Sequence, residues 1–391
     1  MRNLLIAHGG GPKAGINCSL QGALEQARSS GAFDRIYAAR FGAEGILKND
    51  LIDLTDVPAA EIAKLRRTPA SAIGSCRRKL CEADDLAILQ TLERNHIDCF
   101  FYNGGNDSMD TCHKIHTLAE TQGLPLQVIG IPKTMDNDLI LTDHCPGFGS
   151  AARYAAYSAA ELALDASALP IHVVVLELMG RDAGWVTAAG AYAAMCTDCE
   201  VLTYLPELPV QETQMLAEIE KSWAKGRGLL VVLSEGLRRA DGTPLADSGI
   251  VDGFGHTVPG GTAQHLAAQI MERLHLKARA EKPGLLGRCS CGYAAETDRQ
   301  EAYNVGAYTV SAALEGRSGS MVSLAAERDG GYRSHCGLVP LEQVANAEKK
   351  FPLEWILNGN RISPAFFDYA APLMDLCSPD YCRLRRNEGT L

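Results

Sequence analysis

The residues best suited to chemistry lie in one short stretch, residues 130–138, which has the sequence GIPKTMDND. It contains Lys133, Asp136 and Asp138, and a proline restricts the backbone of the turn that presents them. A carboxylate can take a proton from a hydroxyl, and a neighbouring ammonium can stabilise negative charge on a group in transfer. We therefore predict that Asp136 is the general base of a phosphoryl transfer and that Lys133 neutralises the transferred group. Asp138 either binds a metal or is structural.

Two glycine-rich loops add a predicted phosphate site. Residues 9–15 (GGGPKAG) lie between a predicted strand and a predicted helix, an arrangement that points free backbone N–H groups at a phosphate. This loop also fits the dinucleotide pattern GxGxxA, but no acidic residue ends the second predicted strand, and the lysine of a Walker A loop is missing. The second loop, residues 104–108 (GGNDS), places Asp107 and Ser108 at a helix start. We expect a Mg²⁺ and phosphate site there, although helix capping also explains both side chains.

Charged side chains follow three further strand ends or loops. Arg181 comes after a predicted strand, where a single arginine often contacts phosphate, although a salt bridge is the structural alternative. Glu235 ends the next predicted strand and could bind sugar hydroxyls or cap a helix. Arg77 and Arg78 form the basic pair that we expect near an anionic ligand, although such pairs also occur on solvated surfaces.

Hydrophobic periodicity predicts the elements that position these loops. Predicted strands and helices alternate along most of the chain, which is typical of an α/β protein. We predict two Rossmann-like lobes with mostly parallel sheets flanked by helices, and ligands bind such sheets at the carboxyl ends of the strands. Residues 237–260 are expected to be irregular and to form a mobile flap. The predicted strands are residues 3–7, 35–41, 98–102, 126–131, 171–177, 228–234 and 319–325, and the main predicted helices are residues 16–30, 83–95, 147–165, 185–195, 212–225, 261–275 and 297–314.

Composition and charge exclude several classes of protein. The net charge of −10 and the pI of about 5.5 disfavour nucleic acid and anionic membranes as partners. No window approaches the ~18 apolar residues of a membrane span, and the N-terminus lacks a signal-peptide pattern. We therefore expect a cytoplasmic protein whose 13 cysteines are reduced. A zinc site is disfavoured because the pairs at 196/199 and 289/291 lack histidines at zinc-finger spacing.

Taken in order, six short motifs resemble those of the phosphofructokinase family over nearly the whole chain. The resemblance implies Mg²⁺-dependent phosphoryl transfer to the 1-hydroxyl of fructose 6-phosphate. It also implies one phosphofructokinase-like domain over residues 1–391, with a donor-phosphate lobe (1–141), a sugar-phosphate lobe (142–315) and a C-terminal segment (316–391) that packs back on the lobes. Family members are dimers or tetramers, so a homodimer or homotetramer is expected. The matching motifs are residues 9–17, 104–108, 132–138, 142–151, 179–181 and 234–236.

The same resemblance assigns a role to each candidate site residue. The residues that it implies in catalysis are Asp136, Lys133 and Asp107. Those implied in donor-phosphate binding are Gly11, Arg77 and Ser108. Those implied in metal binding are Asn106 and Asp138. Those implied in sugar-phosphate binding are Thr134, Asp136, Met179, Gly180, Arg181, Glu235, Arg288 and Tyr293.

Two positions bear on the phosphoryl donor. ATP-using members of the family resemble Gly-Gly-Asp-Gly-Ser and Pro-Gly-Thr, where this chain has Gly-Gly-Asn-Asp-Ser and Pro-Lys-Thr. The pyrophosphate-using branch carries an aspartate and a lysine where Asp107 and Lys133 stand. A carboxylate placed where the α-phosphate of ATP would lie repels ATP, because like charges ~4 Å apart cost ~4 kcal/mol at an effective dielectric constant of 20. We therefore predict pyrophosphate as the donor and a readily reversible reaction.

Three departures from the family pattern leave alternatives open. Asn106 replaces the usual metal-binding aspartate, and His172 stands where ATP-using members carry an arginine from a neighbouring subunit. Cys291 stands in place of a phosphate-binding arginine, for which Arg288 could substitute. The alternatives are the same chemistry on another sugar phosphate such as sedoheptulose 7-phosphate, ATP as the donor, a non-catalytic sugar-phosphate-binding regulatory homologue, and a dehydrogenase.

Overall fold

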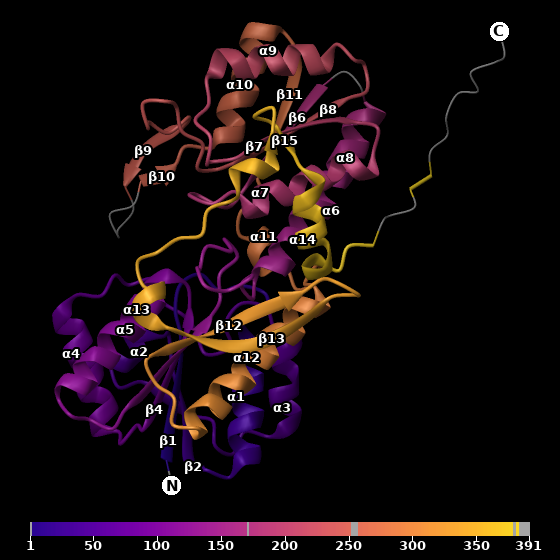
Figure 1. The fold of residues 1–391 in the computed structure, drawn as a ribbon. Helices are drawn as coiled ribbons and strands as arrows, with labels where there is room; N and C mark the ends of the chain where they lie inside the picture. Colours follow the sequence, from indigo (N-terminus) through magenta and orange to yellow (C-terminus); the bar gives the residue numbers. More distant parts are fainter. Residues whose placement is uncertain (1, 170–171, 252–256, 378–380, 383–391) are drawn as a thin grey trace.

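The chain folds into two α/β lobes, one stacked above the other (Figure 1). The computed structural model describes residues 2–169, 172–251, 257–377 and 381–382. Each lobe contains its own β-sheet, and helices pack on both faces of each sheet through separate hydrophobic clusters. The predicted fold class, two Rossmann-like lobes with mostly parallel sheets flanked by helices, is confirmed.

The first sheet has seven strands in the order β13-β12-β5-β4-β1-β2-β3. Its central strands β1, β4 and β5 are parallel neighbours, so their carboxyl ends lie side by side. Only the edge strands β3 and β13 are antiparallel to their neighbours. The strands are β1 (Arg2–His8), β2 (Phe33–Ala39), β3 (Leu51–Asp53), β4 (Cys99–Gly104), β5 (Gln127–Pro132), β12 (Ser320–Glu327) and β13 (Arg333–Pro340).

Two helical layers cover this sheet because alternate strand residues point to opposite faces. Leu4 and Ile6 belong to the cluster that includes residues of α1 and α12, whereas Leu5 and Ala7 belong to the cluster of α2, α4, α5 and α13. All four side chains are completely buried. The helices of this lobe are α1 (Ile16–Ser30), α2 (Ala43–Leu47), α3 (Ala59–Lys64), η1 (Leu65–Arg67), α4 (Glu82–Arg94), α5 (Asn106–Thr121), α12 (Glu296–Leu314) and α13 (Leu341–Val344).

The second sheet has four parallel strands in the order β11-β6-β8-β7. Helices α9 and α10 cover one face, and α6, α7 and α14 cover the other. Its strands are β6 (His172–Leu178), β7 (Glu200–Tyr204), β8 (Leu229–Ser234) and β11 (Lys277–Glu281). The remaining elements are α6 (Phe148–Ala168), α7 (Trp185–Ala189), η2 (Gly190–Tyr192), α8 (Ala193–Cys196), α9 (Glu212–Trp223), β9 (Asp247–Val251), β10 (Thr257–Pro259), α10 (Thr262–Leu274), α11 (Leu286–Cys289), η3 (Leu353–Trp355), β14 (Ile356–Leu357), β15 (Arg361–Ile362) and α14 (Pro364–Met374).

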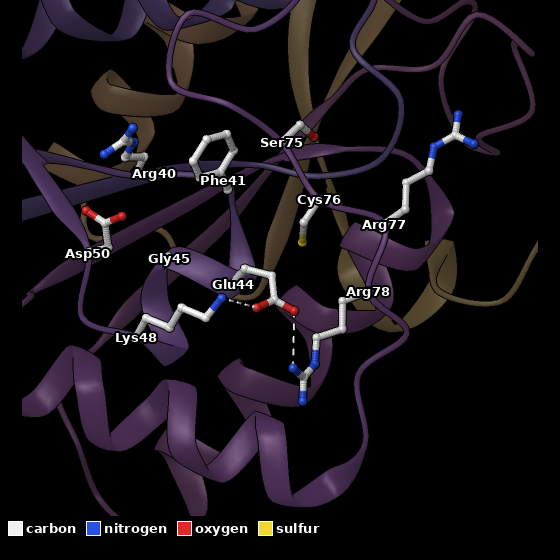
Figure 2. A pocket seen from close by; sticks show the side chains of 10 residues that line it. All are labelled: Arg40, Phe41, Glu44, Gly45, Lys48, Asp50, Ser75, Cys76, Arg77 and Arg78. Carbon is white, nitrogen blue, oxygen red and sulfur yellow. Dashed lines mark hydrogen bonds and ion pairs between the residues drawn. The ribbon is translucent and has the colours of Figure 1, made fainter. Parts of the chain in front are cut away.

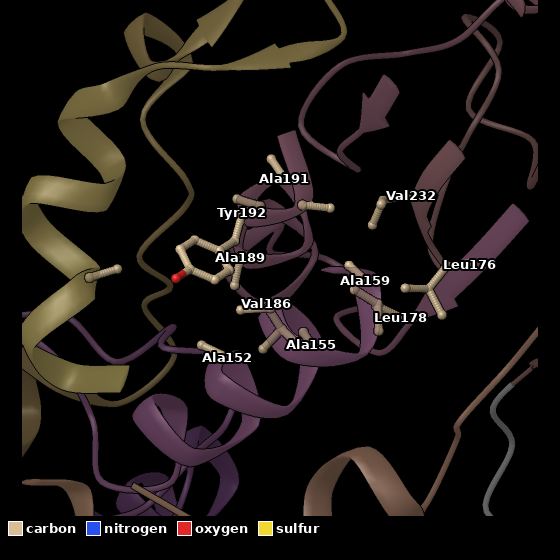
Figure 3. Close-up of a cluster of buried hydrophobic side chains, with 14 of the residues drawn as sticks. Ala152, Ala155, Ala159, Leu176, Leu178, Val186, Ala189, Ala191, Tyr192 and Val232 are labelled. Carbon is tan, nitrogen blue, oxygen red and sulfur yellow. The ribbon is translucent and has the colours of Figure 1, made fainter. Parts of the chain in front are cut away.

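Helix α6 packs closely because one of its faces is lined with alanine. Ala152, Ala155 and Ala159 are buried in the same hydrophobic cluster as Leu176 and Val232 of the second sheet (Figure 3). Small side chains allow a helix to approach its neighbours closely without leaving voids. The helix begins at Phe148, ten residues after the end of the lysine- and aspartate-containing stretch at residues 130–138.

Two predicted segments differ from the structure. The single helix predicted at residues 185–195 is split into α7, η2 and α8. Gly190 lies at the split, where an added Cβ would come within 2.7 Å of Val232, so close packing tightens the chain locally. Residues 237–260 are not simply irregular, because β9 and β10 pair as an antiparallel hairpin. Residues 252–256, within the predicted flap, lie outside the described residues.

The chain crosses between the lobes more than once. Helix α12 falls in the predicted sugar-phosphate range, yet it packs against α1 on the first sheet. The C-terminal segment contributes β12 and β13 to the first sheet and α14 to the second lobe. Within the described ranges, every helix is too short or too polar to span a bilayer.

Candidate active site

The carboxyl ends of β1, β4 and β5 bring three of the motifs together. His8 is paired with Asn103, and Gly104 is paired with Pro132, so the chain leaves all three strands at the same edge of the sheet. Side chains in the loops that follow therefore face a common space, as expected for an open α/β sheet. This edge contains the first glycine loop, the start of α5 and the lysine–aspartate loop.

Lys133 fixes the first glycine loop through hydrogen bonds to its backbone. Its ammonium is buried and donates hydrogen bonds to the carbonyl oxygens of Gly9 at 2.8 Å and Gly11 at 3.1 Å. On the other side, the Ser75 hydroxyl donates to the carbonyl of Gly10 at 2.6 Å. The backbone N–H of Gly10 donates to the carbonyl of Cys76 at 2.9 Å. The loop is therefore fixed before any ligand binds, which is the preorganisation that phosphate stabilisation requires.

Two guanidinium groups converge on Gly11. An added Cβ at Gly11 would lie 2.5 Å from Nη2 of Arg77 and 2.7 Å from Nη1 of Arg288. A side chain here would therefore have to displace the ends of both arginines. Arg77 therefore lies where donor-phosphate binding was predicted. Arg288, predicted at the sugar phosphate, lies beside the same donor loop because the backbone of α11 is bonded to it through the N–H of Ala14, which donates to the carbonyl of Arg288 at 3.1 Å.

A pocket of about 530 Å³ opens beside this loop (Figure 2). Glu44 forms ion pairs at 3.1 Å with both Arg78 and Lys48, so these two cations are already paired. Arg77 extends away from Glu44 in Figure 2, toward the donor loop. The predicted basic pair therefore has two different roles, since Arg78 has a structural partner and Arg77 faces the glycine loop.

The start of α5 places Ser108 and Asp107 differently. An added Cβ at Gly9 or Gly104 would lie 2.2 or 2.0 Å from the Ser108 hydroxyl, so Ser108 is packed between the two glycine loops. Asp107 lies in the first turn of α5 and is exposed to solvent. An anion is stabilised at this end of a helix by the free backbone N–H groups.

The lysine–aspartate loop is held by neighbours on both sides of Asp136. The Asp136 N–H donates to the Thr134 hydroxyl at 3.1 Å. Asn137 adopts a left-handed backbone conformation, with φ of 53°, that asparagine tolerates. The Asn137 amide donates to the Tyr369 hydroxyl at 2.9 Å and accepts from the N–H of Cys145 at 3.0 Å. The half-buried carboxylate of Asp136 is therefore presented from a fixed turn.

Asn106 and Asp138 form the candidate metal site. The Asn106 amide donates to Oδ2 of Asp138 at 2.9 Å. The amide oxygen of Asn106 and the second carboxylate oxygen of Asp138, both Oδ1, are buried and have no hydrogen-bond partner among the described residues. Burial raises the pKa of Asp138 to about 6, and the charge of Asp136 adds to this effect. Two unpartnered oxygens fit Mg²⁺, which proteins usually bind through one or two side chains together with substrate phosphates. The described residues contain no cluster of three or more histidine, cysteine or acidic side chains able to hold a metal.

The second lobe supplies the predicted sugar-phosphate loops. The Ser234 hydroxyl donates to the carbonyl of Gly180 at 2.6 Å, and the N–H of Glu235 donates to the carbonyl of Leu178 at 3.0 Å. An added Cβ at Gly236 would lie 1.7 Å from the carbonyl oxygen of Arg181, so glycine is required there. These contacts bring the two motifs at residues 179–181 and 234–236 together, as their positions at the ends of adjacent strands predict.

A small pocket lies between the lysine–aspartate loop and the second lobe. Met179 and Met135 both line it, together with Tyr154 and the buried Glu177. Tyr293 lies nearby, since its ring centroid is 5.2 Å from that of Tyr154. Burial raises the pKa of Glu235, whereas Lys282 opposes this shift. Glu177 also pairs with Lys282 at 2.5 Å.

Several residues of the site were not predicted from the sequence. Glu177 is at the end of an apolar strand, where it resembles an ordinary core position, and its partner Lys282 is distant in sequence. Lys13 is buried inside the first glycine loop, which was predicted to bind phosphate through its backbone, with no role assigned to this side chain. A lysine in a loop between a strand and a helix was the available signal for phosphate contact.

The glycine loops, the buried lysine and the carboxylates at facing strand ends are the features of an α/β phosphotransferase. A family profile described as phosphofructokinase matches residues 3–313, and this chain belongs to that family.

Several relatives and solved structures match most of the chain. A pyrophosphate–fructose 6-phosphate 1-phosphotransferase of Methylococcus capsulatus is 40% identical over 385 residues, covering 96% of this chain and 92% of the relative. The crystal structure of a pyrophosphate-dependent phosphofructokinase from Nitrosospira multiformis has 36% identity and a TM-score of 0.88, covering 100% of this chain and 95% of that one. A sulfofructose kinase of Alkalicoccus urumqiensis is 33% identical, covering 88% of this chain and 89% of the relative.

Proposed function

We propose that this chain is a pyrophosphate-dependent 6-phosphofructokinase. It transfers a phosphoryl group from pyrophosphate to the 1-hydroxyl of fructose 6-phosphate, giving fructose 1,6-bisphosphate and phosphate, and it works reversibly in glycolysis and gluconeogenesis. The observation that carries the proposal is the buried ammonium of Lys133 beneath the glycine loop, bonded to the carbonyls of Gly9 and Gly11. Relatives named for this activity share 34–40% identity over nearly their full length.

Asp136 is the proposed general base. It takes the proton of the sugar 1-hydroxyl while the new oxygen–phosphorus bond forms and the bond to the leaving phosphate breaks. Lys133, with Arg77 and Ser108 at the donor loop, stabilises the negative charge that shifts onto the leaving phosphate. Thr134 fixes Asp136 through the hydrogen bond to its N–H. The sugar phosphate is held by Met179, Gly180, Arg181, Glu235, Arg288 and Tyr293 in this proposal.

A divalent metal, which we assign as Mg²⁺, completes the proposed site. Asn106 and Asp138 would hold it through their unpartnered Oδ1 atoms. When bound, it would neutralise phosphate charge. Because Asn106 is neutral, the protein contributes one carboxylate to this site instead of two.

Asp107 selects the donor in this proposal. It is an exposed carboxylate at the start of α5, next to the buried Ser108. A third phosphate or a nucleoside extending past Ser108 would meet this charge, at a cost of ~4 kcal/mol for like charges ~4 Å apart at an effective dielectric constant of 20. Pyrophosphate is short enough to avoid that encounter.

A comparison of donors tests the proposal. The purified chain with Mg²⁺ and fructose 6-phosphate is expected to form fructose 1,6-bisphosphate from pyrophosphate, with kcat/KM for ATP at least ~10³-fold lower, which corresponds to ~4 kcal/mol. Asp107→Asn and Asp107→Gly are expected to strengthen ATP binding, measured by calorimetry. Asp110→Asn, one turn further along α5, is the matched control. Equal turnover with ATP by the unaltered protein would exclude the donor assignment.

A second candidate substrate is a sugar that carries a different anionic group in place of the 6-phosphate. A relative is named sulfofructose kinase, and Arg288, one of the proposed sugar-phosphate residues, also lies beside Gly11 of the donor loop. The sugar carried by this site could therefore end in a group other than the 6-phosphate. The ratio of kcat/KM for fructose 6-phosphate, sedoheptulose 7-phosphate and 6-sulfofructose measures this specificity. Binding of a sugar phosphate without turnover would instead support a regulatory homologue, and binding of NAD would support a dehydrogenase.

The remaining assignments belong to the same proposal. Residues 1–141, joined by α12, β12 and β13, form the donor-phosphate lobe, and the rest of residues 142–315 forms the sugar-phosphate lobe. The described part of the C-terminal segment, residues 316–377, packs on both lobes. The protein is a cytoplasmic homodimer or homotetramer with no nucleic-acid or membrane partner. The acidic pI of about 5.5 supports the absence of nucleic acid, and sedimentation analysis measures the oligomeric state.

A further inference from the structure

The feature that carries a further inference is Lys13, in the middle of the first glycine loop. Its side chain is 7% exposed, which is rare for a lysine. Across the described part of the chain, no hydrogen bond or ion pair joins its ammonium to another group. Burying an ammonium without a partner is costly, so such a group is expected to have an anionic ligand.

The surroundings of Lys13 locate that ligand. The aliphatic part of Lys13 passes Gly147, where an added Cβ would lie 3.4 Å from Cβ of Lys13. Gly147 forms an isolated bridge with Thr134, which is two residues before the proposed base. Lys13, which belongs to the first glycine loop, therefore also lies close to the segment that carries Thr134 and the proposed base.

The charges around Lys13 are those of the proposed phosphoryl site. Burial lowers its pKa to about 8, Asp136 and Asp138 oppose the shift, and Arg288 and Arg77 add to it. Lys13 is also the first charge that contributes to the lowered pKa of Lys133, after burial. Four cations and two carboxylates thus act on one another here, an excess of positive charge that suits a multiply charged phosphate.

We propose that Lys13 is a further catalytic residue whose ammonium contacts the phosphoryl group in transfer, between the donor loop and Asp136. This role rests on the proposed function. Lys133 is fixed by two carbonyl oxygens beneath the loop, whereas Lys13 has all three of its ammonium hydrogens available for phosphate oxygens.

Lys13→Met and Lys13→Arg test this role, with Lys64→Met as the matched control. Lys64 is an exposed lysine on α3 whose ammonium pairs with Glu61, remote from the loops described above. Lys13→Met is expected to lower kcat by ~10²-fold or more and to weaken pyrophosphate binding at least ~10-fold, with KM for fructose 6-phosphate nearly unchanged. Lys13→Arg is expected to recover part of the pyrophosphate affinity, and Lys64→Met to behave like the unaltered protein.

Calorimetry with pyrophosphate and Mg²⁺, without sugar, separates this inference from the proposed function. If the unaltered protein fails to phosphorylate fructose 6-phosphate but Lys13→Met still weakens pyrophosphate binding, the phosphate contact stands and the sugar assignment fails. If Lys13→Met binds pyrophosphate and turns over like Lys64→Met, the role of Lys13 is overturned. A melting curve for each variant detects loss of folding. If Lys13→Met is unfolded while Lys13→Arg folds and keeps an unaltered kcat, Lys13 has a structural role alone and the proposed catalytic role is overturned.

Discussion

At the scale of single residues, the candidate site depends on charges held at positions that would be unfavourable without a ligand. Burial lowers the pKa of Lys133 to about 7, and the neighbouring charges of Lys13 and Arg77 add to the shift. His8, at the end of β1, remains neutral because burial lowers its pKa to about 3. The positive charge around the first glycine loop therefore comes from lysine and arginine side chains and not from His8. Preorganised charge of this kind is destabilising in the free protein and useful in the complex.

Asp136→Asn tests the proposed base. The amide has nearly the same shape but cannot take the hydroxyl proton, so kcat is expected to fall by ~10²–10⁴-fold while fructose 6-phosphate and pyrophosphate still bind. Steady-state kinetics and calorimetry measure the two effects separately. Asp165→Asn, on the exposed end of α6, is the control. Near-normal turnover by Asp136→Asn would assign the proton to another group.

At the scale of elements, the C-terminal segment ties the catalytic loop to the second lobe. The N–H of Lys349 donates to the carbonyl of Asp138 at 2.7 Å, and its ammonium donates to the carbonyl of Asp143 at 2.8 Å. Two residues later, the N–H of Phe351 donates to Glu207 at 3.0 Å. Helix α14 adds the contact from Tyr369 to Asn137. The sequence predicted only that the C-terminal segment packs back on the lobes, yet α14 supports the loop that carries the proposed base.

Tyr369→Phe tests this positioning. Removing the hydroxyl leaves the amide of Asn137 without its partner, at a cost of about 1–3 kcal/mol in the free energy of unfolding. Because the loop loses a support, kcat is expected to fall ~10-fold, with smaller changes in KM. Chemical denaturation and kinetics measure these effects. Tyr308→Phe is the control, since the Tyr308 hydroxyl forms no hydrogen bond with the part of the chain that the structure describes.

At the scale of the whole molecule, a buried cluster of charges joins the start of the second lobe to α12 and to the β12–β13 hairpin. One nitrogen of His144 lies 2.9 Å from Asp143, and the other lies 2.7 Å from Glu301. Arg328 pairs with Asp143 through both of its terminal nitrogens. Burial disfavours the charged ring, but the hydrogen bonds to Asp143 and Glu301 outweigh burial and raise the pKa of His144.

This cluster predicts a pH dependence of stability. The folded pKa of His144 is above its unfolded value of ~6.5, so its contribution is complete below that value and is lost as pH rises through the folded pKa. The free energy of unfolding lost in His144→Gln is therefore expected to be larger at pH ~6 than at higher pH. Denaturation at a series of pH values measures this difference. His335→Gln, at an exposed ion pair with Glu327, is expected to show no such trend.

Much of the fold and part of the site could be predicted from the sequence because they depend on local patterns. Alternating apolar runs and helical spacing located β1, α1, β4, β5 and β8 within a few residues. The strands β7, β11 and β13 were missed because their residues do not form the long apolar runs of the central strands. The motif residues at the ends of β1, β4 and β5 met at one edge because parallel neighbouring strands end together.

The sequence by itself determined the two α/β lobes, the glycine loops and the residue types of the chemistry, since each depends on neighbours a few positions away. Only the tertiary structure decided that Arg288 faces Gly11, that Lys13 is buried beside Asp136, and that Tyr369 supports Asn137. The physical reason is that burial and the charge around a group are set by chain segments far apart in the sequence. The sequence does not show whether a lysine or an arginine is exposed to water or buried at a site. Tertiary packing decides between these two environments.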